Sequence, residues 1–309
     1  MSESEQGQHH SARIVEVDGE DDGMRIDNYL LRVLKGVPRS RIYRLLRRGE
    51  VRVNSGRIRP SHRLQRGDQV RIPPIRLESR EQPAGVTPQR RERLERAILF
   101  EDPRLLVIDK PAGIAVHGGS GIDLGLIEAL RLMRPGRTLE LVHRLDRDTS
   151  GCLMVAKRRS ELRALHALLR DGAVDKRYLA LLEGQFREDK WICDAPLALG
   201  RRGGERYAFV DADGKQARSE FRRMQLFRDA TLVEVILHTG RTHQIRAHAA
   251  HLGHPVAGDD RYGRGNDFGA GRLCLHAHAL RFERPHDGED MHFHAPLPAA
   301  LRDAMQRLR

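Results

Sequence analysis

The sequence predicts an α+β fold with a mixed, mainly antiparallel sheet, because segments of strand and helix character follow one another without regular alternation. A parallel sheet would need a crossover connection between successive strands. A second observation divides the chain. Residues 78–96 are rich in charge, proline and glycine, which indicates a linker between a small α+β domain at 24–77 and a larger domain at 97–309.

Positive charge is concentrated in the small N-terminal domain, which is expected to follow a mobile leader at residues 1–23. Residues 24–77 carry 15 Lys or Arg against three acidic residues, so this segment holds the whole net charge of +12 of the 309-residue chain. The other residues carry equal numbers of basic and acidic side chains. A charge that served solubility alone would be spread over the surface, whereas a concentrated one indicates a polyanionic partner.

Within the N-terminal domain, the spacing of apolar residues predicts two helices. The first covers residues 25–35, and the second is capped by Ser40 and ended by Gly49. Short strands are expected at 51–53 and 70–72, where apolar and polar residues alternate.

The larger domain mixes short strands and helices. The expected strands are 105–108, 139–142, 152–156, 178–182, 232–237 and 273–282. The expected helices are 127–133, 160–169, 242–252 and 298–308.

Cysteine usage and hydropathy point to the cytoplasm. Cys152, Cys193 and Cys274 are odd in number and far apart, so a disulfide framework is not expected. No apolar run has the length needed to span a bilayer, and because the first ten residues are polar, a cleaved signal sequence is not expected.

The densest cluster of polar and charged residues is His-Arg-Leu-Asp-Arg-Asp-Thr-Ser-Gly at 143–151, between two apolar strands. So many charges cannot be buried without partners, so this loop is expected at a surface or in a cleft. By itself it could be a solvated connection. A serine-hydrolase site is disfavoured, because His143, Asp146 and Ser150 are too close in sequence for a triad and no nucleophile elbow is present.

Three further clusters stand near strand ends. Residues 240–246 read Gly-Arg-Thr-His-Gln-Ile-Arg, where Thr242 is placed to cap a helix and Arg246 to meet an anion. Lys-Pro-Ala-Gly at 110–113 follows a strand, and Lys-Arg-Tyr at 176–178 opens another. Each cluster taken singly fits an ordinary cap, turn or strand edge.

Together and in this order, the four clusters resemble the RluA-type pseudouridine synthases. The matching motifs are K-P-x-G at 110–113, H-R-L-D-x-x-T-S-G at 143–151, K-x-Y at 176–178 and G-R-T-H-Q-I-R at 240–246. Residues 25–71 resemble the S4 RNA-binding domain. The resemblance implies a pseudouridine synthase fold in the larger domain.

The resemblance also implies a reaction, the isomerisation of uridine to pseudouridine in RNA, which requires no cofactor and no metal. Asp146 would be the nucleophile. Arg246 would pair with the carboxylate and offset the desolvation that would otherwise raise its pKa. Asp148 occupies a variable position of the motif and is expected to be solvated or structural.

Other site residues follow from the same resemblance. Tyr178 would stack on the flipped uracil, Ile245 would form an apolar wall, and Arg144 would fill the space that the base leaves. His143 and Lys110 are further candidates for substrate binding. The candidates for RNA binding in the N-terminal domain are Arg39, Arg41, Arg44, Arg47, Arg48 and Arg52.

The sequences of residues 35–38, 49–54 and 117–121 resemble those of family members that act on large-subunit ribosomal RNA. This RNA is therefore the expected partner, and the protein is expected to be a monomer. Two other hypotheses remain. An RNA-binding assembly factor without activity is disfavoured by intact Asp146, Tyr178 and Arg246. A metal hydrolase is disfavoured by the lack of an H-E-x-x-H motif, although several histidines are closely spaced: His243, His248, His251, His254, His276 and His278.

Overall fold

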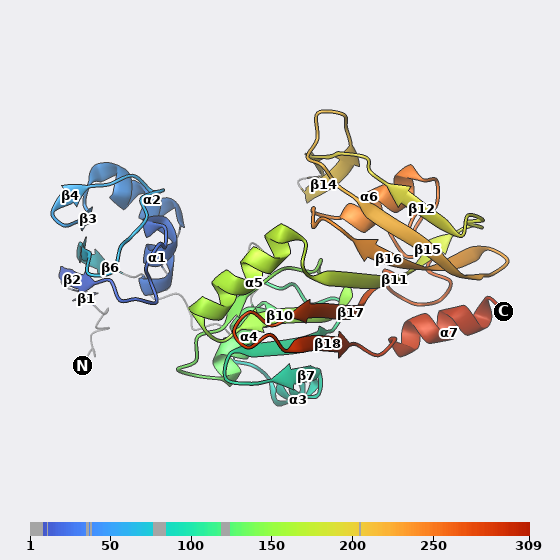
Figure 1. Ribbon diagram of the computed structural model, residues 1–309, viewed down its shortest axis with the longest axis horizontal. Coiled ribbons are helices and arrows are strands. Elements are labelled where there is room, and N and C mark those ends of the chain that lie inside the picture. The colour runs from blue at the N-terminus through green and yellow to red at the C-terminus, as the bar shows by residue number, and fades with distance from the viewer. Residues whose placement is uncertain are drawn as a thin grey trace, which may run out of the picture. The chain divides into compact units, whose positions relative to one another are not determined.

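The computed structural model describes residues 9–10, 12–34, 37, 39–76, 85–118, 124–203 and 205–309 (Figure 1). The chain divides into two compact units, Met1–Gly85 and Val86–Arg309. Cys152, Cys193 and Cys274 are free and buried. No helix in the described ranges combines the length and the apolar character needed to cross a membrane. Parts of two resemblance segments, at 35–36, 38 and 119–121, lie outside the described residues.

The N-terminal unit contains the two expected helices, α1 (Ile26–Val33) and α2 (Arg39–Arg48). Leu30 of α1 and Ile42 of α2 are buried in one apolar core with strand residues such as Val70, which explains the apolar spacing of both helices. The strand order is β2-β5-β3-β4, and β1 pairs with β6. These strands are β1 (His9–His10), β2 (Arg13–Glu16), β3 (Arg52–Val53), β4 (Gly56–Arg57), β5 (Gln69–Ile72) and β6 (Ile75–Arg76).

Two expectations for this unit are wrong. Ser40 lies within α2 rather than before it, because the helix begins one residue earlier at Arg39. The expected leader ends too late, since β2 pairs with β5 and places Val15 opposite Val70. The unit therefore begins before residue 24. Gly49 follows the end of α2 as expected, with a positive φ of 68° that suits glycine.

The C-terminal unit is built on a ten-stranded sheet with the order β12-β15-β16-β11-β17-β10-β8-β7 (Figure 1). Strand β18 pairs with β17, and β9 pairs with β10. Among the described strands of this sheet, β10 and β17 form a parallel pair and the other pairs are antiparallel. The expected mixed, mainly antiparallel sheet is thus confirmed. Strands β13 and β14 form a separate hairpin.

Each strand and helix expected in this unit from the sequence overlaps an observed element, and the structure adds further strands and helix α3. The unit contains the following strands and helices. The strands are β7 (Ile98–Glu101), β8 (Leu105–Lys110), β9 (Glu140–Leu141), β10 (Ser150–Ala156), β11 (Asp175–Glu183), β12 (Lys190–Cys193), β13 (Leu197–Arg202), β14 (Glu205–Val210), β15 (Ser219–Leu226), β16 (Ala230–Leu237), β17 (Leu275–Glu283) and β18 (Asp290–His294). The helices are α3 (Pro88–Arg96), α4 (Leu126–Met133), α5 (Arg159–Asp171), α6 (Gln244–His251) and α7 (Ala299–Arg307).

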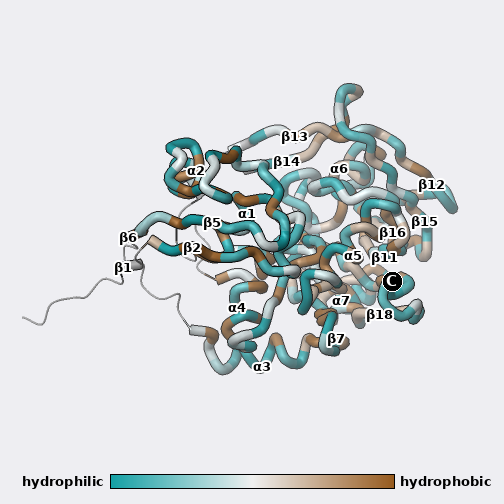
Figure 2. Tube along the Cα trace, turned by 60° about the vertical axis from the view of Figure 1, so that its left-hand side comes forward, coloured by the Kyte–Doolittle hydropathy of each residue, from teal (hydrophilic) through white to brown (hydrophobic). Residues whose placement is uncertain are grey.

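The second half of the expected linker is a helix that belongs to the C-terminal unit. Helix α3 begins after Thr87, whose hydroxyl accepts a hydrogen bond from the Arg90 N–H at 3.3 Å. Most of its trace is hydrophilic (Figure 2), but Leu94 is fully buried in the core of the unit. A single apolar anchor gives no helical period, which is why the sequence pattern resembled a linker. Residues 77–84 lie outside the described part.

The centre of the sheet fixes the loop that precedes β10. All residues of β10 are buried, because it lies between β8 and β17. At its start, Gly151 has a φ of 113°, and a Cβ there would lie 2.2 Å from the carbonyl oxygen of Ala277 in β17. Only glycine permits this close approach. The 143–151 loop is therefore held against the end of β17.

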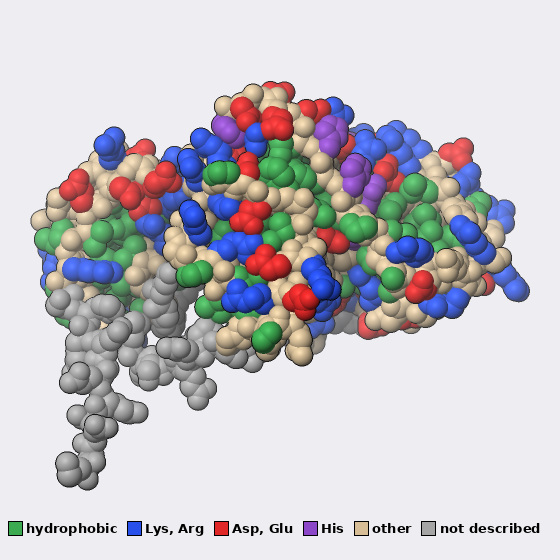
Figure 3. All heavy atoms as spheres, turned by 90° about the horizontal axis from the view of Figure 1, so that it is seen from below, with side chains coloured by type: hydrophobic (Ala, Val, Ile, Leu, Met, Phe, Trp, Pro, Cys, Tyr) green, Lys and Arg blue, Asp and Glu red, His purple; other side chains and the backbone are tan. Residues whose placement is uncertain are grey.

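At the surface, basic and acidic side chains are interspersed on the face seen in Figure 3.

Candidate active site

A small cavity of about 110 Å³ lies where the 143–151 loop, β11, β17 and the start of α6 meet. Five residues that the sequence singled out line it together: Arg144, Asp146, Tyr178, Ile245 and Arg246. The other lining residues are Leu145, Thr149, Leu237, Gly240, Arg241, Thr242, His243, Gln244 and Leu275.

Lys110 does not line the cavity but binds the backbone of the 143–151 loop. The expectation that Lys110 contacts substrate is therefore wrong. Its side chain is fully buried, and Nζ donates to the carbonyl oxygens of Pro111, Ile114 and Arg147, each at 2.9 Å. The Gly113 N–H also donates to the Arg147 carbonyl. An ammonium group has three protons to donate, and all three have acceptors here. The K-P-x-G motif thus ties its own turn to the 143–151 loop.

His143 is likewise structural in its contacts rather than a lining residue. Its Nε2 accepts a hydrogen bond from the Met154 N–H at 3.1 Å, which fixes the loop to β10. Burial, followed by the positive charge of Lys176, lowers the pKa of His143 to about 4. The imidazole is therefore neutral at pH 7, as an acceptor at Nε2 must be. The expectation that His143 binds substrate is corrected.

Asp146 and Arg246, expected as a pair, come together in the cavity. Arg246 Nη1 lies 3.6 Å from Asp146 Oδ2, and the Asp146 side chain is 18% exposed. The carboxylate is therefore open to a ligand on one side and faces a positive charge on the other. Asp148 of the same loop lies at the surface against Arg147, at 3.1 Å, which confirms the solvated position expected for it.

Arg246 lies closer to a second carboxylate, that of Asp259, than to Asp146. The sequence did not suggest Asp259 as a partner of Arg246. Arg246 Nε and Nη2 donate to the two carboxylate oxygens of Asp259 at 2.7 and 2.8 Å. The Asp259 side chain is fully buried and also accepts the N–H groups of Arg261 and Tyr262. Burial opposes the charge of Arg246, but the ion pair with Asp259 outweighs it, and the pKa of Arg246 is raised. The guanidinium is thus locked with Nη1 towards Asp146.

The turn before α6 brings His243 to the same carboxylate. His243 adopts a left-handed conformation with a φ of 52° and stands at the N-cap of α6, so Thr242 is not the cap that the sequence predicted. The turn is closed instead by the side-chain oxygen of Gln244, which accepts from the Arg241 N–H and from the Thr239 hydroxyl. His243 Nε2 lies 3.9 Å from Asp146 Oδ2.

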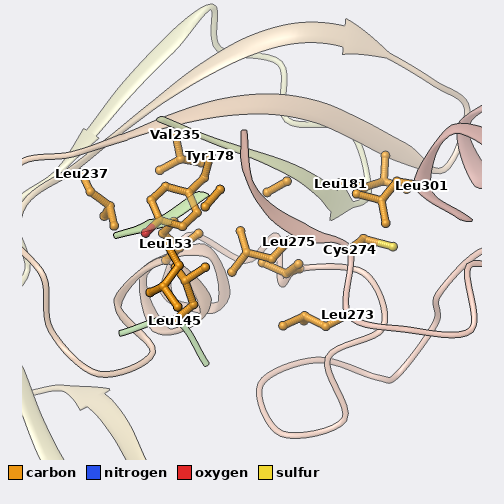
Figure 4. Close-up of a cluster of buried hydrophobic side chains, with 14 of the residues drawn as sticks. Leu145, Leu153, Tyr178, Leu181, Val235, Leu237, Leu273, Cys274, Leu275 and Leu301 are labelled. Atoms are coloured by element: carbon orange, nitrogen blue, oxygen red, sulfur yellow. The ribbon is translucent and has the colours of Figure 1, made fainter. Parts of the chain in front are cut away.

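Tyr178 forms the apolar floor of the site. Its ring lies in a cluster of buried apolar side chains that includes Leu145, Leu153 and Leu237 (Figure 4). Burial and then the negative charge of Asp146 raise the pKa of the Tyr178 hydroxyl, which is therefore protonated at neutral pH. A neutral phenol with a fixed ring is suited to stack on a flat base.

Two further lining residues differ in exposure. Arg144 is exposed at the cavity rim, with no hydrogen-bond or ion-pair partner in the described ranges. Thr149 is almost fully buried, and within the described part of the chain its hydroxyl has no hydrogen-bond partner. An unpaired buried hydroxyl in a cavity wall is suited to a polar group of a ligand. Nothing in the sequence pointed to Thr149 beyond its place in the motif.

The histidines behind the metal hypothesis are dispersed through the fold. His248 contacts the Ser219 hydroxyl and the Ala195 carbonyl, whereas His276 contacts the Ser150 hydroxyl and the Ala295 carbonyl. Among the residues that the structure describes, no three His, Cys, Asp or Glu side chains are grouped as metal ligands would be. The close spacing in sequence reflects separate structural roles in α6 and β17.

Known protein families match both units of the chain. The family model for RNA pseudouridylate synthase matches residues 104–251, and that for the S4 domain matches residues 24–70. Ribosomal large subunit pseudouridine synthase C of Haemophilus influenzae is 49% identical, with 97% of this chain and 96% of the relative covered. The protein of the same name from Escherichia coli (strain K12) is also 49% identical, with 97% of each chain covered.

Solved structures give a consistent result. Human RNA pseudouridylate synthase domain containing 1 matches with a TM-score of 0.55 and 29% identity, over 69% of this chain and 94% of that chain. Human RNA pseudouridylate synthase domain containing 4 has the same fold, with a TM-score of 0.59 and 24% identity, over 71% of this chain and 95% of that chain.

Proposed function

The chain belongs to the RNA pseudouridylate synthase family, and from that premise we propose that it isomerises specific uridines of large-subunit ribosomal RNA to pseudouridine, with Asp146 as the nucleophile. The observation that carries the assignment of Asp146 is its partly open carboxylate, 3.6 Å from the locked guanidinium of Arg246 in the lined cavity. The relatives, which are named for large-subunit ribosomal RNA, support the substrate class.

The reaction breaks the N1–C1′ bond of uridine and forms a C5–C1′ bond in the same nucleotide. N1 gains a proton and C5 loses one, so no net oxidation or hydrolysis takes place and no redox cofactor is needed. The carboxylate proposed as the nucleophile has the guanidinium of Arg246 beside it, with Nη1 3.6 Å from Asp146 Oδ2. Because Asp259 binds two other guanidinium nitrogens, Arg246 cannot turn fully onto Asp146 and mask it.

The lining residues fit a flipped base. A uridine in folded RNA must leave its stack before it can reach Asp146, at a cost of a few kcal/mol. Tyr178 and Ile245 offer an apolar wall for the uracil. Arg144, exposed at the rim, has the planar cationic side chain needed to fill the vacated stack and contact phosphate. Thr149 offers a hydroxyl to a polar edge of the nucleotide.

The test is pseudouridine mapping on unmodified large-subunit ribosomal RNA incubated with the wild-type protein in the presence of a metal chelator. We expect pseudouridine at a small number of uridines, with full activity in the chelator because no step is assigned to a metal. RNA binding without any product would contradict the proposal and favour an assembly factor. Activity that the chelator abolishes would contradict the assignment of the chemistry to Asp146 alone.

The N-terminal unit is proposed to place the enzyme on its RNA. Ile42, Leu45 and Leu46 of α2 are buried, so the helix turns its basic face to solvent. Exposed side chains on or near this face are Arg44, Arg47, Arg48 and Arg52. Arg41 is half-buried, and the side chain of Arg39 lies outside the described part. A groove beside them also contains Arg71, which the sequence did not single out.

Neutralising part of the basic face should weaken RNA binding in a salt-dependent way. In the double variant Arg44→Ala/Arg47→Ala, we expect the slope of log affinity against log salt to fall by about 1 for each phosphate that is no longer bound. Filter binding across a salt series measures this slope. The control is Arg91→Ala/Arg93→Ala, which removes the same charge from exposed positions of α3. Equal changes in both variants would mean that only net charge matters and that α2 is no interface.

We further propose that the protein acts as a monomer in the cytoplasm. The three residues with proposed catalytic roles, Asp146, Tyr178 and Arg246, come together within one chain. Three free, buried cysteines suit a reducing compartment.

A further inference from the structure

One short segment, residues 259–262, contacts both groups that face the Asp146 carboxylate. Asp259 binds Arg246, and Tyr262 binds His243. These two residue pairs also contact each other. The Asp259 carboxylate accepts a hydrogen bond from the Tyr262 N–H at 3.1 Å, and the Arg246 guanidinium lies 5.1 Å from the centre of the Tyr262 ring. The segment lies outside the four motifs, and its role rests on the proposed function of Asp146.

The hydroxyl of Tyr262 has its donor and acceptor roles fixed by its neighbours. The backbone N–H of Ala208 in β14 donates to the Tyr262 oxygen at 2.7 Å, and a backbone amide can only donate. The second contact of that oxygen is His243 Nδ1 at 3.0 Å. Among the described residues, His243 Nδ1 is the neighbour that could accept the phenol proton, so donation from Tyr262 to Nδ1 is the arrangement that gives this proton an acceptor.

This contact fixes the tautomer of His243. A neutral imidazole that accepts at Nδ1 carries its proton at Nε2. Nε2 is the ring atom that faces Asp146 Oδ2, at 3.9 Å. The ring also meets Tyr262 edge to face, at 5.7 Å between centroids, which holds its plane. His243 thus presents an N–H to the cavity without forming a full ion pair with the carboxylate.

We propose that Tyr262 and Asp259 are positioning residues, which hold two N–H donors, His243 Nε2–H and Arg246 Nη1–H, facing the nucleophilic carboxylate at 3.9 and 3.6 Å. Tyr262 acts by excluding the other neutral tautomer, whose Nε2 would be an acceptor and would repel the carboxylate. Asp259 acts by taking two of the guanidinium nitrogens. Fixed donors of this kind act on the substrate-bound carboxylate without reorganisation during the reaction.

The arrangement predicts how pH acts on the site. The groups that face His243 are Asp146 and Asp259, which favour the imidazolium, Arg246 and Arg144, which disfavour it, and Tyr262, which donates to the neutral form. Burial is the largest influence, and the pKa of His243 is lowered. Loss of the Tyr262 hydroxyl removes a stabilisation of the neutral form, so the pKa of His243 rises. The imidazolium then forms at higher pH and pairs with Asp146, which moves the acid limb of the pH–rate profile to higher pH.

The direct test is the tautomer of His243, observed by ¹⁵N NMR on protein with labelled histidine. The signal is assigned by its loss in His243→Gln. In the wild type at neutral pH we expect a bare Nδ1 and a protonated Nε2, and in Tyr262→Phe a mixture of tautomers. A protonated Nδ1 in the wild type, or an unchanged signal in Tyr262→Phe, would overturn the proposal. This readout needs no RNA, so it is independent of whether the proposed reaction is right.

The second test of the positioning roles measures kcat and KM of the variants. In Tyr262→Phe we expect kcat to fall about 10-fold and in Asp259→Asn about 100-fold, with KM for RNA changed less than about twofold, because misplacement affects the reacting geometry rather than RNA contacts. The control is Asp260→Asn, which neutralises the adjacent exposed carboxylate and should leave kcat unchanged. A loss that follows thermal stability alone, with an unshifted acid limb in Tyr262→Phe, would mean that the segment only supports the fold.

Discussion

Asp146→Asn is expected to abolish pseudouridine formation, with a loss on the order of 10⁴-fold or more, while the protein remains folded. Asparagine has the shape of aspartate, but its amide is not a nucleophile and carries no charge. The fold should tolerate the change because Arg246 keeps both hydrogen bonds to Asp259 and is not left unpaired. Among the described residues the Asp146 side chain makes no hydrogen bond, and Arg246 Nη1 lies 3.6 Å from its Oδ2.

Single-turnover assays on large-subunit ribosomal RNA, with circular dichroism as a check on folding, measure this effect. Asp148→Asn is the matched control, since it makes the same chemical change two residues away. Its carboxylate lies at the surface beside Arg147, so we expect nearly full activity. Equal activity of wild type and Asp146→Asn would identify another nucleophile, and loss in Asp148→Asn alone would show that the wrong aspartate was chosen.

Arg246→Ala should lower the free energy of unfolding by about 3–5 kcal/mol and also abolish activity, because it leaves the charge of Asp259 buried without its partner. The Asp259 side chain is fully buried, so water cannot replace the guanidinium unless the site opens. The substitution also removes the cation that lies over the Tyr262 ring. Urea unfolding followed by fluorescence or circular dichroism measures the loss of stability.

A double variant separates stability from catalysis. In Arg246→Ala/Asp259→Ala both charges of the buried pair are removed, so part of the stability should return while activity stays absent. Arg264→Ala, which removes an exposed guanidinium, should change neither quantity. If the double variant recovered activity together with stability, Arg246 would act through the fold alone and not on Asp146.

Local patterns were sufficient for most of the secondary structure, because they depend on burial within one element. The helices α1, α2, α4 and α5 show apolar residues at helical spacing and appear where that spacing predicts them. Other elements are held by pairing partners instead. Strand β15 exposes Met224 and Leu226, and in β12 Trp191 and Ile192 are exposed, so neither alternates in a way that marks a strand. Helix α3 is likewise anchored by Leu94 alone.

The sequence by itself determined the family, the reaction and the expected pairing of Asp146 with Arg246, because these depend on residue types in ordered motifs. Only the tertiary structure decided which motif residues reach the cavity. Lys110 and His143 belong to the motifs, yet their polar atoms are taken up by backbone groups. Asp259 and Tyr262 are outside the motifs but hold Arg246 and His243. Whether a polar group faces a ligand or a backbone partner depends on the packing of distant segments, and no local pattern records that packing.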